Sequence, residues 1–576
     1  MKALLIILMS LLFALIPGKG ESENTMTDYE KKWKQVEKYK EKGLPRSALE
    51  VVTTIYHEAK QNNNTPQFLK ALIYRLSLQS EFEVNYNEQA IKTLNKEIDS
   101  ATNEVQKSLL HSMQGELFWN YYRQNRFKIS ERSATKVIEQ DIATWDIRTI
   151  LQHARKHYHA SLDYQQPAAG KDLEAIAEIL TEHVNTLHLR PTIYDFVAYR
   201  ALDFFQSSDY LLTKANLEIA YRDKALFDTV KEFLRQDFSS NPHETAALQV
   251  YQSLLRLHQN NEAALAEANM KRLEHVQQNH VAANSKKHYR EALAAFATRI
   301  EKNPEWSLVK YYLAKAEYTT DPNPRNAEEH THKNQQAAAA LKHCNEATEA
   351  YPDSYGASRA KAFREQILQK NLTLSVEHAV PPKKPFPVAV SYANFKEVHF
   401  RLYRINPDGA WNQKRLSRED KLEFLLRKQP LLFFSKKLTD EDKYVATTTE
   451  LIMPPAAPGF YVLLASASPD FIPKDKPTTF AELWVTNISF VNWEHDNNNV
   501  ELTFLDRQDG QAIKKADVSC ISRSYDYKTQ GYDFETLKKF ETARDGRLQI
   551  TDKDIQATFF NVQVKRGGLN ILIGDL

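Results

Sequence analysis

The sequence predicts a multidomain α + β protein, with an N-terminal α-solenoid of helical hairpins followed by two antiparallel β-sandwich domains. A chain of 576 residues is too long for one hydrophobic core. Only five of its 14 glycines precede Gly356, so this long first part lacks the residue most used in turns and is expected to be helical. From about Asn371, apolar residues alternate between proline-rich and Asp-Gly turns, which is typical of β-strands.

Residues 1–20 have the outline of a secretory signal peptide. Lys2 precedes an apolar run from Ala3 to Ile16, and small residues follow it in the expected cleavage region. The run is shorter than the ~20 residues that cross a bilayer, and no later stretch approaches that length. We therefore expect export to the periplasm, the cell envelope or the extracellular space, with no integral membrane span after cleavage. An uncleaved signal-anchor is the alternative.

Residues 25–370 are expected to form helices paired as hairpins. In "WKQVEKYKEKGLPRSALEVVTTIY", Trp33 and Val36 lie on one apolar stripe, Gly43-Leu44-Pro45 interrupts it, and Val52 and Ile55 lie on the next. This pattern predicts two antiparallel helices joined by a short turn.

The segment 289–318, "YREALAAFATRIEKNPEWSLVKYYLAKAEY", resembles a tetratricopeptide repeat. Asn303-Pro304 separates its two helical stripes, and small residues such as Ala292 and Ala314 allow the two helices to approach closely. A second unit follows in "AALKHCNEATEAYPDSYGASRAKAF" with the same spacing from its Ala-Leu pair to its proline. We expect an α-solenoid of such hairpins, without an exact repeat count.

Residues 371–480 are expected to form a β-sandwich with a helical insertion. The segments "LTLSVEHAV" and "VHFRLYRI" alternate, and "PGFYVLLASAS" is a short buried run bounded by turn residues. Between them, Leu422, Leu425 and Leu426 have helical spacing.

Residues 481–576 are expected to form a second sandwich. The loops "RQDGQ" and "ARDGR" supply Asp-Gly turns, and "KRGG" joins two further strands. The strands are expected at 500–505, 516–522, 547–550, 559–565 and 569–573.

The charge and cysteine content limit the classes of partner and the source of stability. Lys+Arg 76 against Asp+Glu 74 gives a net charge of +2, which gives no electrostatic reason to expect nucleic acid as a partner. Cys344 and Cys520 are the only cysteines, and they are expected in different domains. Stability must therefore come from cores rather than disulfides.

Cys344 is the nearest candidate for a thioester, which needs Cys-x-x-Gln spacing. The segment is "CNEA", which lacks the glutamine and falls on an expected helix. The neighbouring His343 points about 100° away around that helix, so it is poorly placed as a base for the thiol. We interpret Cys344 as a small packing residue.

Two groups of histidines are candidate metal sites. His153 and His157 lie at i, i+4 on one helical face, and "EEHTH" brings together Glu328, Glu329, His330 and His332. Neither group has the His-Glu-x-x-His pattern. We interpret them as solvated helix and loop histidines.

Ser358 and Lys361 have the Ser-x-x-Lys spacing of penicillin-recognising enzymes, but the companion motifs are absent from the sequence. Gly-x-Ser-x-Gly, P-loop and dinucleotide-binding glycine patterns are absent as well. The sequence therefore predicts a non-enzymatic protein with no catalytic, cofactor-binding or metal-binding residues and no cofactor.

The aromatic stretch "ELFWNYYRQNRF" could form a stacking platform or a helix core. Leu117, Tyr121 and Tyr122 fall on one helical side, which favours core packing over ligand contact.

Several long segments together resemble a known family. They are "GLPRSALEVVTTIY", "KALIYRL", "SLLHSMQGELFWNYYRQNRF" (108–127), "WDIRTI" (145–150), "AELWVTNISFVN" and "LTFLDRQDGQAIKKADVSCISRSYDYKTQGYDF". The chain resembles the N-terminal part of the bacterial alpha-2-macroglobulin family, in the form found in Bacteroidetes, over nearly its whole length.

The resemblance implies an exported protein in which a helical region precedes macroglobulin-type sandwiches, and a parent activity of endopeptidase inhibition by protease trapping. It also implies that this chain is an N-terminal portion, without the Tyr-x-Pro-Gly-type strand that opens the next sandwich in many relatives. The expected partners are proteases or envelope proteins. The alternative is an envelope adaptor that binds a protein partner through the solenoid.

Overall fold

The computed structural model describes most of the chain between residues 27 and 573. The described residues are 27–83, 86–130, 142–180, 186–213, 221–318, 327–406, 411, 416–438, 444–472, 477–495, 499–526, 531–551, 561–566 and 569–573. The predicted signal peptide at residues 1–20 and the second half of the "KRGG" turn lie outside them. Within the described residues, no helix has the length and apolar character needed to cross a bilayer.

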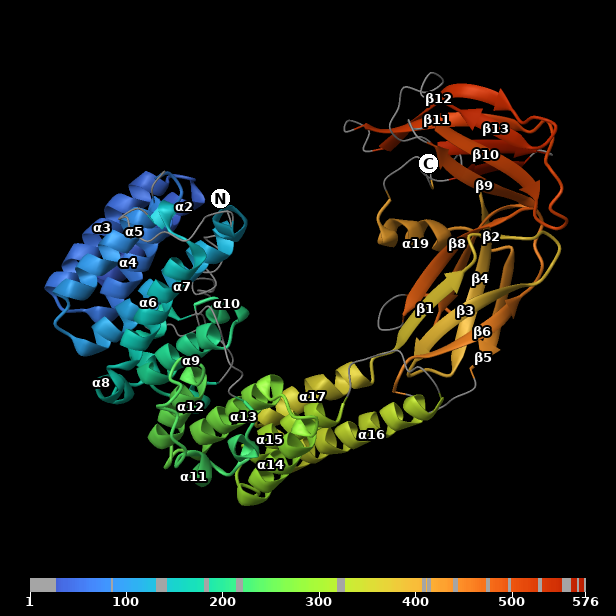
Figure 1. Ribbon diagram of the computed structural model, residues 1–576. Helices are drawn as coiled ribbons and strands as arrows, with labels where there is room; N and C mark the ends of the chain where they lie inside the picture. The colour runs from blue at the N-terminus through green and yellow to red at the C-terminus, as the bar shows by residue number, and fades with distance from the viewer. Residues whose placement is uncertain are drawn as a thin grey trace. The chain divides into compact units, whose positions relative to one another are not determined.

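The chain divides into two compact units, which we call the helical unit and the strand unit (Figure 1). The helical unit comprises residues 1–316 and 342–362, and the strand unit comprises residues 317–341 and 363–576. A helical N-terminal region followed by a strand-rich C-terminal region confirms the expected α + β class at this level. The predicted domain limits at 370 and 480 remain predictions.

The helical region is built from α-helices and short 3₁₀ helices. In chain order they are α2 (Asp28–Glu41), α3 (Pro45–Gln61), α4 (Thr65–Gln79), α5 (Tyr86–Ser100), α6 (Glu104–Ser130), η1 (Ile142–Thr144), α7 (Ile147–Leu162), α8 (Gln165–Ala169), η2 (Leu173–Ile179), η3 (Leu187–Leu189), α9 (Ile193–Phe205), α10 (Ser208–Leu211), η4 (Lys224–Phe227), α11 (Val230–Phe233), α12 (Ala246–Leu257), α13 (Glu262–Asn279), α14 (Ser285–Arg299), α15 (Trp306–Glu317), α16 (Ala327–Ala350) and α17 (Tyr355–Ile367).

Local sequence signals fix the ends of several helices. Thr27 and Glu30 form a capping box at the start of α2, and Thr192 and Asp195 form one at the start of α9. Pro45 occupies the first turn of α3, where its missing N–H costs nothing. The predicted helical hairpin at the start of the chain is confirmed as α2 and α3.

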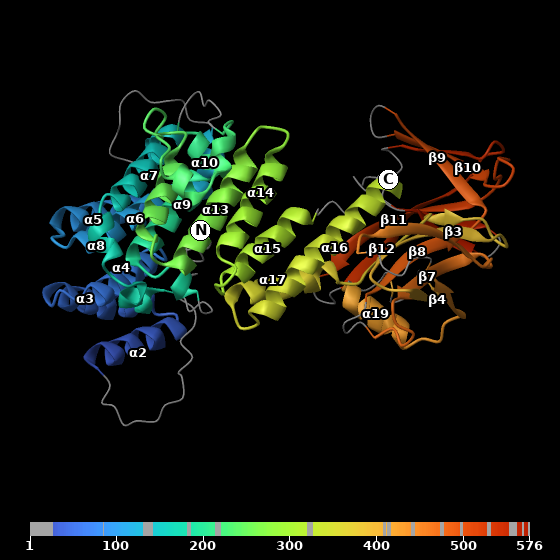
Figure 2. The ribbon, with the colours of Figure 1, turned by 90° about the horizontal axis from the view of Figure 1, so that it is seen from below.

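The helices α13, α14 and α15 run alongside one another in both views (Figures 1 and 2). The two helices expected in segment 289–318 are confirmed as α14 and α15. α17 approaches α15 closely at Gly356, because a Cβ on this residue would lie 2.1 Å from the backbone nitrogen of Leu308. Only glycine fits at this crossing.

In the described part of the strand unit, strands β1 to β15 form four sheets, and the helix α19 lies among them in the sequence. The elements are β1 (Asn371–Val376), β2 (Ala379–Val380), β3 (Phe386–Ala393), β4 (Glu397–Ile405), α19 (Arg418–Leu426), β5 (Leu432–Lys437), β6 (Thr447–Met453), β7 (Gly459–Ser466), β8 (Thr478–Val485), β9 (Ile488–His495), β10 (Asn499–Asp506), β11 (Asp517–Asp526), β12 (Gly531–Glu541), β13 (Arg547–Ile550), β14 (Asn561–Arg566) and β15 (Leu569–Ile573).

Strands β1 to β8 form two sheets around one core. The sheets have the strand orders β1-β3-β6 and β2-β8-β7-β4-β5, and all their pairs are antiparallel except β2 with β8. Val388 and Val390 of β3 line this core together with Leu463 of β7. The other side of β7, with Val462 and Leu464, packs in a second core that includes α19. Because both sides are covered, every residue of β7 is buried, which explains its continuous apolar run.

The remaining strands form two further sheets, β13-β10-β9 and β12-β11-β14-β15. Leu502 and Leu548 from the first sheet share a core with Val518 and Val562 from the second. The two Asp-Gly loops form turns in which the glycine adopts a left-handed backbone conformation, with φ of +72° at Gly510 and +78° at Gly546. The five strands expected here are present within a few residues of the predicted limits.

Two features of this region differ from expectation. The segment "FAELWVTNISFVN" reads in sequence as one apolar strand run, but it forms β8 and β9, which belong to different sheets. β12 was not predicted, and its residues 534–539 are exposed, so it lacks the buried alternation that marks a strand in sequence. The predicted helical insertion is confirmed as α19, whose Leu425 is buried.

Candidate functional site

The predicted histidine pair lies in an aromatic cluster rather than in solvent. His153 stacks on Trp145 with ring centroids 4.5 Å apart, and it lies 5.2 Å from Phe118. His157 lies between Phe118 and His111, whose Nδ1 atom is 3.0 Å from the His157 Nδ1 atom. The interpretation of His153 and His157 as solvated was therefore wrong, because α6 and α7 pack these rings against each other.

Burial sets the protonation of this cluster. It lowers the pKa of His157 to about 3, assisted by the neighbouring His111, His153 and Lys156. The pKa values of His111 and His153 are also lowered, mainly by burial. Neutral rings explain the contact, since one Nδ1–H donates to the other Nδ1. Within the described residues, no group of three or more histidine, cysteine or acidic side chains could hold a metal ion.

The "EEHTH" residues lie in the first turns of α16. His330 Nε2 is 2.8 Å from Thr447 Oγ1 of β6, and its Nδ1 is 3.0 Å from the Asn334 amide nitrogen. Glu329 forms an ion pair of 3.1 Å with Lys333. His330 is therefore engaged within the strand unit, and His332 is exposed.

The candidate nucleophiles are not assembled into a site. Cys344 is fully buried on α16, and Nδ1 of the adjacent His343 lies 3.4 Å from Glu346 Oε2. Ser358 and Lys361 are both exposed on α17. Cys520 is buried in the core of the strand unit, so the two cysteines belong to different units.

The aromatic residues of α6 serve the core, as expected. Leu117, Tyr121 and Tyr122 are all buried. The preference for core packing over a stacking platform is therefore confirmed.

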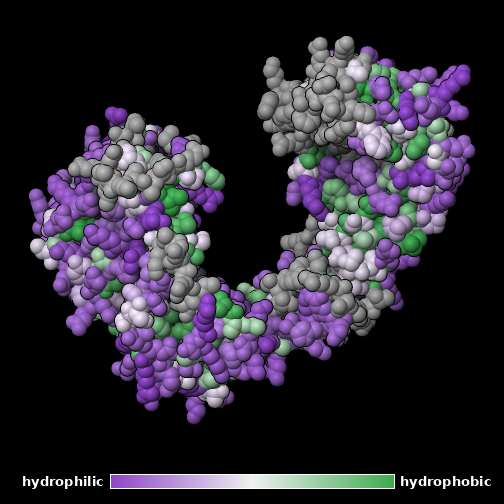
Figure 3. All heavy atoms as spheres, in the orientation of Figure 1, coloured by the Kyte–Doolittle hydropathy of each residue, from purple (hydrophilic) through white to green (hydrophobic). Residues whose placement is uncertain are grey.

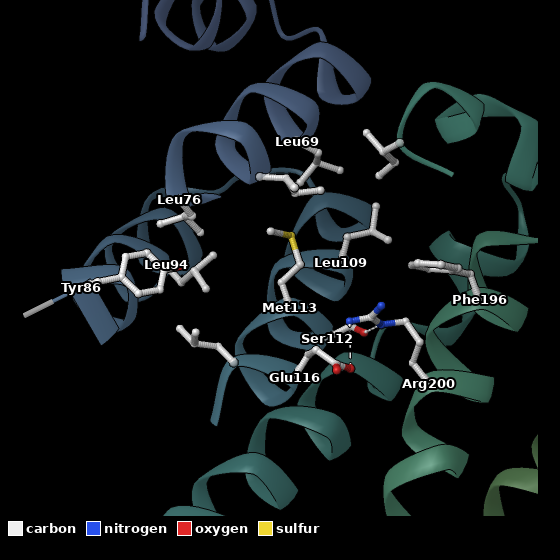
Figure 4. Close-up of a pocket in the computed structure, with 13 residues that line it drawn as sticks. Leu69, Leu76, Tyr86, Leu94, Leu109, Ser112, Met113, Glu116, Phe196 and Arg200 are labelled. Atoms are coloured by element: carbon white, nitrogen blue, oxygen red, sulfur yellow. Dashed lines mark hydrogen bonds and ion pairs between the residues drawn. The ribbon is translucent and has the colours of Figure 1, made fainter. Parts of the chain in front are cut away.

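One pocket lies among α4, α5, α6 and α9 (Figure 4). Its walls are leucines such as Leu69 and Leu109, and its polar end is Arg200, which donates to Ser112 Oγ at 3.0 Å and to Glu116 Oε2 at 3.3 Å. Its volume is about 50 Å³. Ligand pockets usually have about 300–1,000 Å³, so this pocket is a packing gap, and its ion pair holds α6 to α9.

A much larger hollow, which we call the basic groove, lies between η4–α11 and the helices α13 and α14. Its volume is about 490 Å³, which lies within the usual range for ligand sites. Its cationic lining residues are Lys224, Lys231, Arg272 and Arg299, its carboxylates are Asp228 and Glu291, and its apolar lining residues are Phe227, Val230, Leu273, Ala292, Ala295 and Phe296. His288, Asn269 and Thr229 complete the lining.

Arg272 is the unusual member of the basic groove, since it is 1% exposed and no carboxylate of the described residues accepts a hydrogen bond from it. Its guanidinium donates to the backbone oxygens of Leu226 and Asp228, both at 3.0 Å, and to Asn269 Oδ1 at 2.9 Å. It also stacks over Phe233. Burial lowers the pKa of Arg272 to about 9, which leaves it charged at neutral pH.

The exposed cations of the basic groove add to this buried charge. Lys224, Lys231 and Arg299 are exposed and form no ion pair within the described part of the chain. Of the two carboxylates, Glu291 is engaged by His288, with 3.3 Å between Nδ1 and Oε2. The groove therefore has an excess of positive charge, although the whole chain is nearly neutral.

The sequence interpretation missed the basic groove. A local signal was present, because Arg272 follows Leu265 by seven residues and precedes Val276 by four on α13, and so occupies the apolar stripe of the helix. A charged residue on such a stripe is rarely buried without a function or a network. The cations of η4 and α11 could not be placed near it, since their segment is irregular.

The structure thus defines a two-part protein in which a helical region with a basic groove precedes a region of small antiparallel sheets. No family model and no curated protein matches the chain. A solved structure of native alpha-2-macroglobulin from Escherichia coli spanning domains MG0-NIE-MG1 is similar at 14% identity and a TM-score of 0.24, over 35% of this chain and 64% of that fragment.

Pseudomonas fluorescens alkylpurine DNA glycosylase AlkC, solved bound to DNA containing an abasic site analog, is similar at 13% identity. The match covers 70% of this chain and 97% of that one, with a TM-score of 0.12. Similarities at this level support a coarse likeness at most, so neither protein decides the function of this chain.

Proposed function

We propose that this chain is an exported, non-enzymatic protein of the alpha-2-macroglobulin type, whose parent activity is the inhibition of endopeptidases by trapping. The helical region would precede macroglobulin-type β-sandwiches, each built from two of the sheets described above. The chain would contribute no thioester, since Cys344 is buried on a helix and lacks the Cys-x-x-Gln spacing.

The observation that supports this proposal is the pairing of sheets in the strand unit. One core lies between β1-β3-β6 and one side of the sheet that contains β7, and a second core joins β13-β10-β9, the sheet that contains β11, the other side of β7 and α19. Paired antiparallel sheets after a helical region are the order that the sequence resemblance implies. The long segments quoted above add the family-specific part of the argument.

The test uses the native protein purified from the producing cells, whatever its length. It is incubated with an endopeptidase, and cleavage of a large protein substrate is compared with cleavage of a small chromogenic peptide. An enclosing inhibitor should slow the first reaction much more than the second, because only the small substrate can still reach the enclosed active site. Equal rates with and without the protein, for both substrates, would contradict the proposal.

The second candidate function is an adaptor that binds a protein partner through the helical region. The observation that favours it is the basic groove, which has the size of a ligand site and lies wholly within the helical unit. Crosslinking in envelope extract should capture one saturable partner, and a groove-lining charge reversal, Lys231→Glu, should reduce that capture. Capture that is unchanged in this variant would contradict the use of the groove.

A further inference from the structure

We propose that the basic groove binds an acidic peptide segment of a partner protein, about five residues long in extended form. This inference rests on the adaptor proposal, and it adds the site and the chemical class of the ligand. The inhibitor proposal does not depend on it.

The length follows from α14, which forms one wall of the groove. His288 and Arg299 lie on the same face of this helix, and the offset of eleven positions from one to the other corresponds to about 16 Å at the rise of an α-helix. Ala292 and Ala295 lie between them and are small, which leaves the groove open along this distance. An extended peptide covers the same distance in about five residues.

The charge of the ligand follows from the buried guanidinium and the groove rim. Among the described residues, Arg272 donates hydrogen bonds only to backbone and amide oxygens, and the Asp228 carboxylate acts on its charge without accepting a hydrogen bond. Lys224 and Lys231 lie on the opposite wall from α14, in η4 and α11. Acidic side chains placed among these cations would gain favourable interactions that a neutral peptide would not.

The apolar lining distinguishes a peptide from other anions. Val230, Ala292 and Ala295 are partly or fully exposed and offer surface to apolar side chains, and a nucleic-acid backbone has no such side chains. A phosphate ion would occupy only a small part of about 490 Å³. A short segment with acidic ends and an apolar middle matches both the cations and the apolar surface.

The experiment measures fluorescence anisotropy of a rhodamine-labelled peptide, Glu-Leu-Phe-Leu-Asp, with the full chain lacking residues 1–20. We expect saturable binding that weakens at high salt, because charge attraction contributes to it. The twin peptide Lys-Leu-Phe-Leu-Lys has the same apolar middle and should bind at least about tenfold more weakly.

Two variants place the binding in the groove. The double charge reversal Lys224→Glu with Lys231→Glu should weaken the acidic peptide by about tenfold or more. The variant Ala295→Trp fills the groove from an exposed position and should also abolish binding. The matched control is Lys42→Glu with Lys96→Glu, which makes the same charge change at exposed lysines elsewhere on the helical unit and should leave binding within about twofold.

Three results would overturn the proposal. The two peptides could bind equally, the groove variants could bind like the unchanged chain, or millimolar inorganic phosphate could displace the peptide completely, which would assign the groove to a small anion. The protease assay of the proposed inhibitor should not change in any groove variant. Failure of peptide binding and failure of protease inhibition are therefore separate results.

Discussion

The two units of the chain are stabilised by different kinds of core. The helical unit buries ionisable side chains, among them Glu97, Asp195, Glu267 and Arg272, and these four form hydrogen bonds to residues of other helical segments. The strand unit encloses two cores that consist almost entirely of aliphatic and aromatic residues. The visible surface follows a related trend, since the strand part shows broader hydrophobic areas than the helical part (Figure 3).

This difference indicates where specificity and stability come from in each unit. Directional contacts such as the 2.7 Å bond between His258 Nε2 and Asp195 Oδ1 fix how neighbouring helices are placed. Apolar cores depend on volume and packing and are insensitive to pH. The two units should therefore respond differently to acid, to added volume and to removed volume.

Acid should have the largest effect, and it should act on the helical unit. Burial lowers the pKa of five histidines in this unit, to about 3 for His157 and about 4 for His159 and His275, and also lowers it for His111 and His153. The unfolded histidines take up protons first, near pH 6.5, so the stability from neutral burial is present above pH 6.5 and is lost as the pH falls toward 3 to 4.

Hydrogen exchange with mass spectrometry can follow each unit separately during a urea titration at several pH values. We expect peptides of α6 and α7 to unfold at lower urea as the pH falls, before peptides of β7 do. The variant His157→Phe, which removes one titrating ring from the cluster, should weaken this dependence, and His332→Phe at an exposed position is the control. An acid response that is the same for both units would remove the distinction drawn here.

Added volume should be most harmful where two helices touch. Gly356→Ala would place a Cβ 2.1 Å from the backbone nitrogen of Leu308, so α17 must move away from α15. The expected loss is on the order of 4 kcal/mol in the free energy of unfolding. Gly170→Ala is the control, because the nearest atom to its Cβ is 3.5 Å away. Urea denaturation read on peptides of α15 measures both, and a harmless Gly356→Ala would contradict the close crossing.

Removed volume should be most harmful in the strand unit. Leu464→Ala on β7 deletes a fully buried side chain from the larger apolar core, with an expected loss of about 3 kcal/mol. The exposed Leu431→Ala is the matched control and should change stability by less than about 0.5 kcal/mol. The measurement is urea denaturation followed through peptides of β7 and β8, and equal losses in the two variants would argue against the core.

The smallest expected effect on stability comes from removing one buried tyrosine hydroxyl in each unit. Tyr251 accepts a 2.7 Å hydrogen bond from Gln206, so Tyr251→Phe should cost about 1 kcal/mol. The buried hydroxyl of Tyr392 has no hydrogen-bond partner among the described residues, so Tyr392→Phe should be neutral or stabilising. The same urea titration reads both variants, and a larger loss for Tyr392→Phe would reverse the expected order.

The parts of the fold that were predictable are those with a periodic buried face. The apolar stripe of Trp33 and Val36 and the alternation at 500–505 each report one side that avoids water, and both elements are present. The change of sheet between β8 and β9 was not predictable, because apolar alternation continues through Thr486 and the turn has no glycine or proline.

The site was less predictable than the fold. The pairing of His111 with His157 and the gathering of Lys224, Lys231 and Arg299 around one hollow depend on how distant segments pack. Single-sequence patterns report which side of an element is buried, but not what it is buried against. The metal and nucleophile candidates were judged from spacing alone, and the structure brings none of these described candidates together into a three-residue metal site.

The parallel pairing of β2 with β8 has a consequence for the order in which the protein acquires its structure. Val380 lies beside Val485, so this sheet edge joins residues roughly a hundred positions apart. Helical hairpins such as α2 and α3 need only local contacts and can form as soon as their residues have been synthesised. The five-stranded sheet must wait until residue 485 has arrived, and its unfinished edge is the part of the chain most exposed to wrong pairing during synthesis.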